Sequence, residues 1–144
     1  MVTFSSSKNL IMVSLLWLTV ISLLITPFIP DFGEENLTVE IIGFIIIYAV
    51  CGLLIWILVD TKYRLNKQNL YYYCGPFRGN IPVDKIRKIE RWNKWYVTSS
   101  MKPALDSDGF IIYYEKFDDI YISPKNKENF IKILLEINPN IEVI

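Results

Sequence analysis

Two long apolar segments dominate the first part of the hydrophobic and polar pattern of this chain. Charged residues are absent from 9–30 and again from 41–59, and the apolar run 39–59 ends where Asp60 opens a polar segment. At about 1.5 Å rise per residue, each segment is long enough as a helix to cross a hydrocarbon core of about 30 Å. The pattern predicts a transmembrane hairpin over 1–60, with spans at about 9–30 and 39–59.

Two other interpretations of these segments are less favourable. Buried core helices of a soluble protein would need more chain around them than 144 residues supply, because both segments are apolar on all sides. The first segment could instead be a signal peptide. It is longer than a typical signal-peptide core, however, and no small-residue cleavage site follows it.

The charges beside the spans predict their orientation. The loop 31–38 carries acidic residues and no Lys or Arg, whereas Lys8 precedes the first span and Lys62, Arg64 and Lys67 follow the second. Positive residues are enriched on the cytoplasmic side of membrane proteins. We therefore expect a multi-pass protein of the cell membrane, with both termini in the cytoplasm and the loop outside.

Residues 61–144 change to the short alternating runs that are typical of strands. The run 85–92 suits a helical turn as well as a strand, and its β-like neighbours favour a strand. We expect a loop at 93–108. The expected strands are 61–65 (TKYRL), 70–75 (LYYYCG), 79–83 (GNIPV), 85–92 (KIRKIERW), 109–114 (GFIIYY) and 120–122 (IYI), with a turn at Asp118 and Asp119 between the last two.

The last part of the chain predicts one amphipathic helix. Ser123 can cap its N-terminus and Pro124 suits its first position, while Asn138 and Pro139 end it. The tail 141–144 could add a final short strand. Apolar residues follow the i, i+3, i+4, i+7 spacing of a helix face at Phe130, Ile133, Leu134 and Ile137. The pattern predicts an α+β domain, a small antiparallel sheet or open barrel capped by this helix.

These runs together resemble the bacterial pleckstrin-homology-like (PH-like) domain family, which follows one or two membrane spans in small Gram-positive proteins. The resemblance rests on the strand pair 63–75, the run IPVDKI at 81–86, and ISPKNKENF at 122–130. It implies a partly open β-barrel or bent sheet that a C-terminal helix closes. Some members of the family are similar to bacteriocin self-immunity proteins, although fold alone does not fix function.

Charge is unevenly distributed within the predicted domain. Residues 61–102 carry a net charge of +8, and residues 103–144 carry −4. The cytoplasmic leaflet is anionic, so the basic half could face lipid headgroups. Lys62, Arg64 and Lys67 could equally serve only to set the orientation of the spans. The candidate residues for lipid or partner binding are Lys62, Arg64, Lys67, Arg87, Lys88, Arg91, Trp92, Lys94, Trp95 and Tyr96.

The stretch 91–96, RWNKWY, interleaves aromatic rings with cations. This composition suits a membrane interface or the centre of a protein interface. Nucleic acid could use the same chemistry, but membrane tethering makes it an unfavourable partner. Alternatively, Trp92 and Trp95 could close the open end of a small barrel, because aromatic side chains contribute much of a small core.

The sequence contains no recognisable catalytic or metal-binding motif. Histidine is absent, which removes the commonest general base and metal ligand, and neither a phosphate-binding loop nor a nucleophile motif occurs. Cys51 and Cys74 show no spacing that pairs them. We therefore expect no enzyme activity, no cofactor and no metal.

The function that these observations favour is a non-catalytic, membrane-anchored PH-like binding module at the inner leaflet of a Gram-positive bacterium. Its expected partners are anionic lipid, a membrane protein or a peptide toxin, and bacteriocin immunity is one form that this role could take. The alternative is an accessory structural subunit of a larger membrane transporter or envelope complex.

Overall fold

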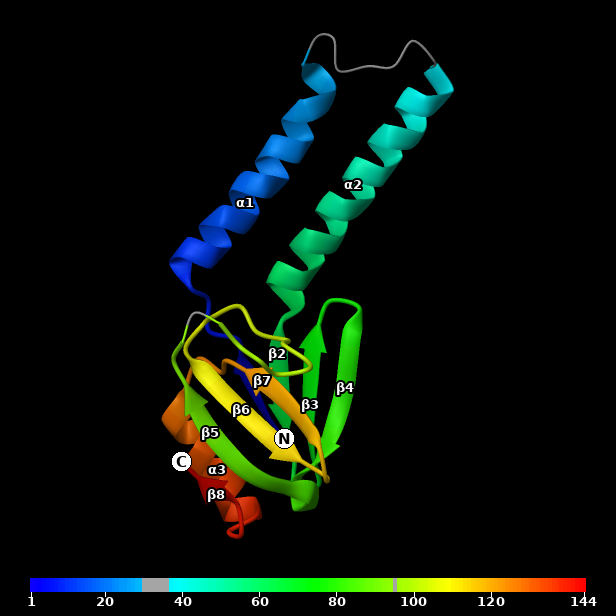
Figure 1. Ribbon diagram of the computed structural model, residues 1–144. Coiled ribbons are helices and arrows are strands. Elements are labelled where there is room, and N and C mark those ends of the chain that lie inside the picture. The colour runs from blue at the N-terminus through cyan, green and yellow to red at the C-terminus, as the bar shows by residue number, and fades with distance from the viewer. Residues whose placement is uncertain (30–36, 95) are drawn as a thin grey trace.

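The computed structural model describes residues 1–29, 37–94 and 96–144 of the chain. Two long helices form one end of the molecule, and two sheets with one helix form the other (Figure 1). This arrangement confirms the predicted fold class, in which a helical hairpin is joined to a PH-like α+β domain.

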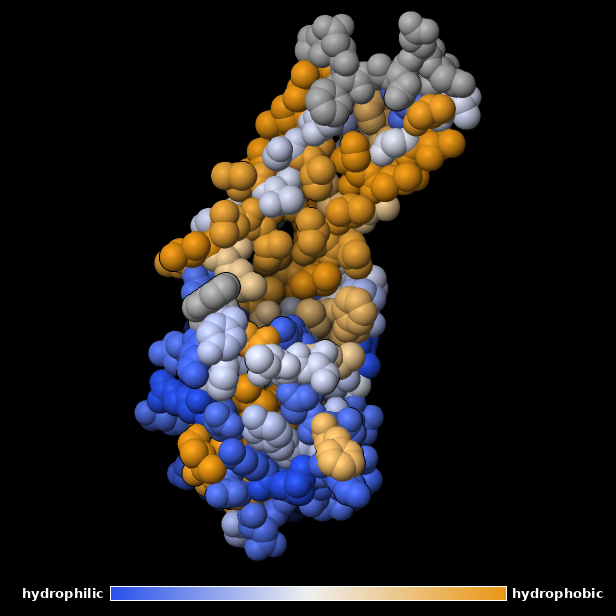
Figure 2. Space-filling view, viewed as in Figure 1, coloured by the Kyte–Doolittle hydropathy of each residue, from blue (hydrophilic) through white to orange (hydrophobic). Residues whose placement is uncertain are grey.

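The hairpin consists of α1 (Leu10–Ile25), extended by the 3-10 helix η1 (Thr26–Phe28), and α2 (Leu37–Asp60). Only 6% and 11% of their most apolar windows are buried inside the protein, so they are not core helices of the domain. Figure 2 shows the hydrophobic surface that this leaves along the hairpin. Both helices are long and apolar enough to cross a membrane. The predicted outer loop falls largely on 30–36, outside the described residues.

Val20 and Cys51 mark a point of contact between the two helices. Val20 of α1 and Cys51 of α2 are both buried, and Cys51 Sγ lies 4.0 Å from the carbonyl oxygen of Val20, toward which it donates. Cys51 and Cys74 are both free thiols.

The first sheet contains four antiparallel strands in the order β1-β2-β3-β4. Three of the strands agree with those expected at 61–65, 70–75 and 79–83, except that the last begins earlier, at Phe77. The strands are β1 (Val2–Ser5), β2 (Lys62–Leu65), β3 (Asn69–Cys74) and β4 (Phe77–Pro82).

Strand β1 was not predicted from the sequence. It pairs with β2 in a register that sets Phe4 opposite Tyr63 and Ser5 opposite Lys62. Phe4 is buried, and its ring meets that of Phe130 edge-on at 5.2 Å between centroids. Residues 2–5 therefore add a strand to the domain expected at 61–144, and both ends of the hairpin emerge from the same sheet.

The second sheet has the order β7-β6-β5-β8, and its last strand pairs in parallel with β5. The structure confirms the strand expected at 85–92 and the short C-terminal strand. The strands of this sheet are β5 (Ile86–Trp92), β6 (Gly109–Tyr114), β7 (Asp118–Ile122) and β8 (Glu142–Val143). A 3-10 turn, η2 (Val83–Lys85), leads into β5.

The expected turn at Asp118 and Asp119 is wrong. Both residues belong to β7, where they pair with Tyr114 and Tyr113 of β6. The connection consists of residues 115–117 instead, and Glu115 takes a positive φ of 48° there. The pairing extends two residues further because each aspartate opposes a β-forming tyrosine, although aspartate itself disfavours strands.

Helix α3 (Lys127–Ile137) confirms the predicted apolar face, with Phe130 and Leu134 fully buried. Its start differs from the prediction, because Asn126 is the N-cap and accepts a hydrogen bond from the Asn129 N–H. Ser123 does not cap the helix. It is completely buried beyond β7, where its backbone N–H donates to the Tyr63 hydroxyl oxygen.

The core lies between the two sheets and α3. It combines side chains from every layer, including Leu65, Ile81, Ile89, Ile112 and Phe130. Among them, Tyr63 contributes a fully buried hydroxyl that donates to the carbonyl oxygen of Pro103 at 2.6 Å. Burial raises the pKa of this phenol, so the donor stays protonated well into the alkaline range.

Candidate functional site

Three cationic side chains converge on one aromatic ring on the outer face of the first sheet. The strand register sets Lys62 opposite Tyr73 and Tyr73 opposite Arg78, so one tyrosine and two of the cations form a row across β2, β3 and β4. Lys62 Nζ, Arg78 Cζ and Arg64 Cζ lie 5.7, 5.6 and 5.2 Å from the centroid of the Tyr73 ring. We call these four residues the basic cluster.

The basic cluster is joined to the last turn of α2. Lys62 Nζ lies 2.7 Å and Arg78 Nη2 lies 3.1 Å from the carboxylate oxygens of Asp60, the last residue of that helix. Arg78 Cζ is also 5.9 Å from the centroid of the Trp56 ring. The cluster therefore lies at the base of the hairpin, and its three cations leave a net charge of +2 beside a single carboxylate.

Arg64 carries the clearest sign of an unfilled binding capacity. Within the described part of the chain, its Nε is buried and has no hydrogen-bond partner. A buried donor without a partner is costly. Arg64 as a whole is only partly buried, so an oxyanion can bind the guanidinium group from the surface. The arrangement suits the recognition of a phosphate or carboxylate group.

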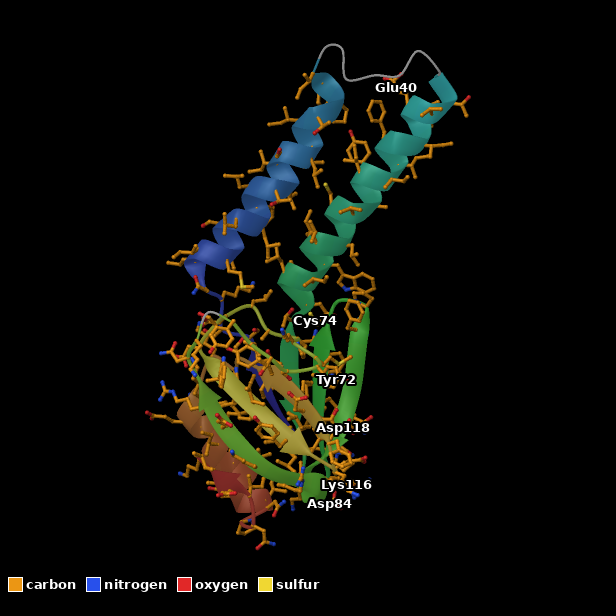
Figure 3. All side chains as sticks on the ribbon, in the orientation of Figure 1. Glu40, Tyr72, Cys74, Asp84, Lys116 and Asp118 are labelled. Carbon is orange, nitrogen blue, oxygen red and sulfur yellow. The ribbon has the colours of Figure 1, made fainter. Side chains whose placement is uncertain are left out.

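Lys67 and Arg87 lie away from this cluster. Lys67 borders a shallow hollow with Asp84 and residues 137–140. Arg87 Nη2 donates to the carbonyl oxygen of Lys116 at 3.0 Å. Figure 3 shows Asp84 and Lys116 at the end of the domain opposite the hairpin, so the structure does not bring these two basic residues to the base of the helices.

Two further basic residues of β5 face acidic neighbours. Lys88 Nζ lies 3.4 Å from Glu90 and 5.3 Å from the centroid of the Tyr113 ring. Arg91 Nη2 lies 3.7 Å from Asp108. Their charge is therefore partly compensated by Glu90 and Asp108.

Trp92, Lys94 and Tyr96 form a separate aromatic cluster. The Trp92 Nε1–H donates to the carbonyl oxygen of Tyr96 at 2.7 Å, and the two rings meet at 83°. Lys94 Nζ lies 4.7 Å from the centroid of the Trp92 ring. Trp92 is half-buried and does not belong to the core cluster, whereas Trp95 lies outside the described residues.

A groove of about 730 Å³ joins this aromatic cluster to the base of α1. Tyr96 is one of its lining residues. The others come from the start of α1, from the loop before β6 and from β7. They are Asn9, Ile11, Met12 and Leu15, then Val97, Lys102, Ala104, Asp106 and Ser107, and Tyr121.

Two of these features were not proposed from the sequence. In the sequence Arg78 is visible only as part of the positive charge of 61–102. The signal that identifies it is the hairpin register between β3 and β4, which sets it opposite Tyr73. No local pattern in the sequence predicts the groove, because it forms only where the loop before β6 folds back onto the N-terminal segment. The backbone N–H of Asn9 donates to the carbonyl oxygen of Leu105 there.

A model of a bacterial PH domain family matches residues 61–138. The Bacillus subtilis protein described as uncharacterized protein YyaB is 32% identical over 99 residues. That match covers 68% of this chain and 66% of the relative, so it spans slightly less than two thirds of the relative's length. No solved structure matches the chain. The family suggests a non-catalytic binding module. Since the family model covers more than half of the residues, the chain belongs to the bacterial PH domain family.

Proposed function

We propose that the chain is a membrane-anchored, non-catalytic binding module whose basic cluster binds anionic phospholipid headgroups at the inner leaflet. The observation that carries the proposal is the convergence of Lys62, Arg64 and Arg78 on Tyr73 at the end of α2. If α2 spans the bilayer, its last residue lies at the headgroup level. The cluster then meets lipid phosphates with a net charge of +2.

The proposed orientation follows from the charges beside the spans. Lys8 precedes the first span and Lys62 follows the second, whereas the sequence between the spans carries acidic residues and no Lys or Arg. The cytoplasmic leaflet attracts each nearby cation by about 1 kcal/mol. The net charge of +2 therefore favours an anionic lipid over a zwitterionic one by about 2 kcal/mol, or roughly thirtyfold.

The test is the retention of phosphatidylglycerol over phosphatidylcholine by the full-length protein, measured by native mass spectrometry from mixed micelles. The double variant Arg64→Gln and Arg78→Gln should lose the preference. The matched control, Lys67→Gln and Arg87→Gln, removes the same charge from the far end of the domain and should keep it. Equal retention by the two double variants would reject headgroup binding at the cluster.

Bacteriocin immunity is the finer form of this proposal. It is supported by the resemblance to self-immunity proteins, and an anchored module could shield a membrane target from a toxic peptide. Expression in a sensitive strain, followed by challenge with a broad panel of bacteriocins, should reveal protection against at least one. Unchanged killing across the panel would count against immunity without affecting the lipid proposal.

The alternative role is that of an accessory subunit of a larger transporter or envelope complex. The exposed sides of α1 and α2 favour it, because little of either helix is covered within this chain. Purification in a mild detergent should then recover a stoichiometric membrane partner. A homogeneous monomer or homodimer would argue for the binding module instead.

A further inference from the structure

The groove at the base of α1 has one apolar side and one polar side. Ile11, Met12 and Leu15 form the apolar side, and they are 72%, 47% and 60% exposed. This side is continuous with the apolar surface of the helix above it. The polar side comes from the loop before β6, which contributes Lys102 and Asp106.

The polar side offers one positive and one negative group with free hydrogen-bonding capacity. Lys102 Nζ donates to the carbonyl oxygen of Val97, which uses one of the three N–H groups of an ammonium. Asp106 accepts from the Ser7 hydroxyl at 2.5 Å and from the Asp108 N–H at 3.3 Å. Those two bonds hold the carboxylate in place and leave about two of its four lone-pair sites for another donor.

The charge of the groove differs from that of the basic cluster. Lys102 and Asp106 balance each other, so the groove favours a ligand that carries one charge of each sign. A carboxylate prefers an ammonium that donates N–H bonds over a trimethylated nitrogen, which has none to give. The volume of about 730 Å³ lies within the range of about 300–1,000 Å³ that is usual for small-molecule sites.

We propose that this groove binds one molecule of phosphatidylethanolamine. Lys102 takes the phosphate, Asp106 takes the ammonium, and an acyl chain lies along Ile11, Met12 and Leu15. The proposal rests on the membrane placement given above, but it concerns a second site at the other helix and a different headgroup. The module thus contacts the leaflet through an anionic-lipid site below α2 and a zwitterionic-lipid site below α1.

The first test compares lipids that differ only in the amine. Native mass spectrometry of the full-length protein in an equal mixture should show phosphatidylethanolamine retained over phosphatidylcholine by about tenfold, the factor that corresponds to about 1.4 kcal/mol. Asp106→Asn should remove this discrimination and leave phosphatidylcholine retention unchanged. Lys102→Gln should lower the retention of both lipids. Asp118→Asn, on the domain below Tyr72 (Figure 3) and outside the groove lining, is the matched control and should behave like the wild type.

Equal retention of the two lipids by the wild type, or discrimination that survives Asp106→Asn, would overturn the proposal. The wild type also supports a test that needs no variant. A phosphatidylethanolamine probe with a photoreactive group on the acyl chain should label peptides that contain 11–15. Labelling spread evenly over α1 and α2 would show ordinary bilayer contact and overturn the groove as a site.

The two lipid sites fail separately in these experiments. The double variant Arg64→Gln and Arg78→Gln should lose phosphatidylglycerol and keep the discrimination between ethanolamine and choline lipids. If phosphatidylglycerol preference is absent while that discrimination persists, the proposed function of the basic cluster fails and the groove stands. Soluble phosphoethanolamine should not displace the lipid; displacement at millimolar concentration would identify a free metabolite as the ligand and overturn the lipid assignment.

Discussion

The two helices of the hairpin enter the domain in different ways. Helix α2 ends at Asp60 and continues directly into β2, so the cluster at its base is set by the register of neighbouring strands. Helix α1 begins after β1, and its base is held by contacts with the loop before β6. One site is therefore built from local sequence and regular pairing, and the other from contacts between distant segments.

The largest effect is expected where β1 enters the core. Phe4→Ala should lower the free energy of unfolding by about 3–5 kcal/mol, because it removes a buried ring that packs edge-on against Phe130. Urea unfolding of the detergent-solubilised protein, followed by near-ultraviolet circular dichroism, measures the loss. Val2→Ala, on the same strand at an exposed position, is the control. A cost below 1 kcal/mol for Phe4→Ala would mean that the N-terminal segment is not part of the domain.

A smaller loss of stability is expected when the buried Tyr63 hydroxyl is removed. Tyr63→Phe removes the bond to the carbonyl oxygen of Pro103 and leaves the buried N–H of Ser123 without its acceptor. A buried group left unsatisfied costs about 1–3 kcal/mol. The same unfolding measurement applies, with Tyr71→Phe on the outer face of β3 as the control. Equal stability of the two variants would show that water replaces both bonds.

The regular half of the molecule is the part that its sequence predicts well. The alternation of apolar and polar residues in 62–75 predicts a strand pair, and the spacing from Phe130 to Ile137 predicts α3. The basic residues of β2 were also identified as candidates. These signals are local, because a strand or helix period is visible within one segment.

The parts that the sequence missed or misplaced depend on distant partners. Strand β1 has only four residues and one buried side chain, which is too short for a periodic signal. Ser123 has the pattern of a cap, but the Ser6 hydroxyl lies 3.1 Å from its own hydroxyl and draws the residue into the β7 end. The same N-terminal segment lines the groove, so no local pattern could have predicted that Lys102 and Asp106 line it together with α1.

The Asp60 carboxylate at the base of α2 gives a test in which lipid retention should rise rather than fall. Asp60→Asn removes the negative charge beside the basic cluster. Binding of phosphatidylglycerol should then strengthen by about 1 kcal/mol, which raises its retention roughly fivefold. Native mass spectrometry with the lipid mixture used for the arginine variants measures the change. A fall in retention would contradict a role set by net charge and would show that Asp60 acts by positioning Lys62 and Arg78. The ethanolamine preference at the base of α1 should not move.

The smallest effect is expected at Lys94, the cation of the aromatic cluster. Lys94 lies over the rings of Trp92 and Tyr96, and an exposed cation–π contact contributes about 0.5–1 kcal/mol. Lys94→Gln should therefore lower stability by no more than that amount and change phosphatidylglycerol retention by less than about twofold, whereas Arg64→Gln alone should lower retention by roughly fivefold. A loss of retention with Lys94→Gln that matches the loss with Arg64→Gln would show that cations at both helix bases bind anionic lipid. The distinction between the base of α1 and the base of α2 would then be wrong, because it assigns Lys94 to the aromatic cluster and Arg64 to headgroup binding.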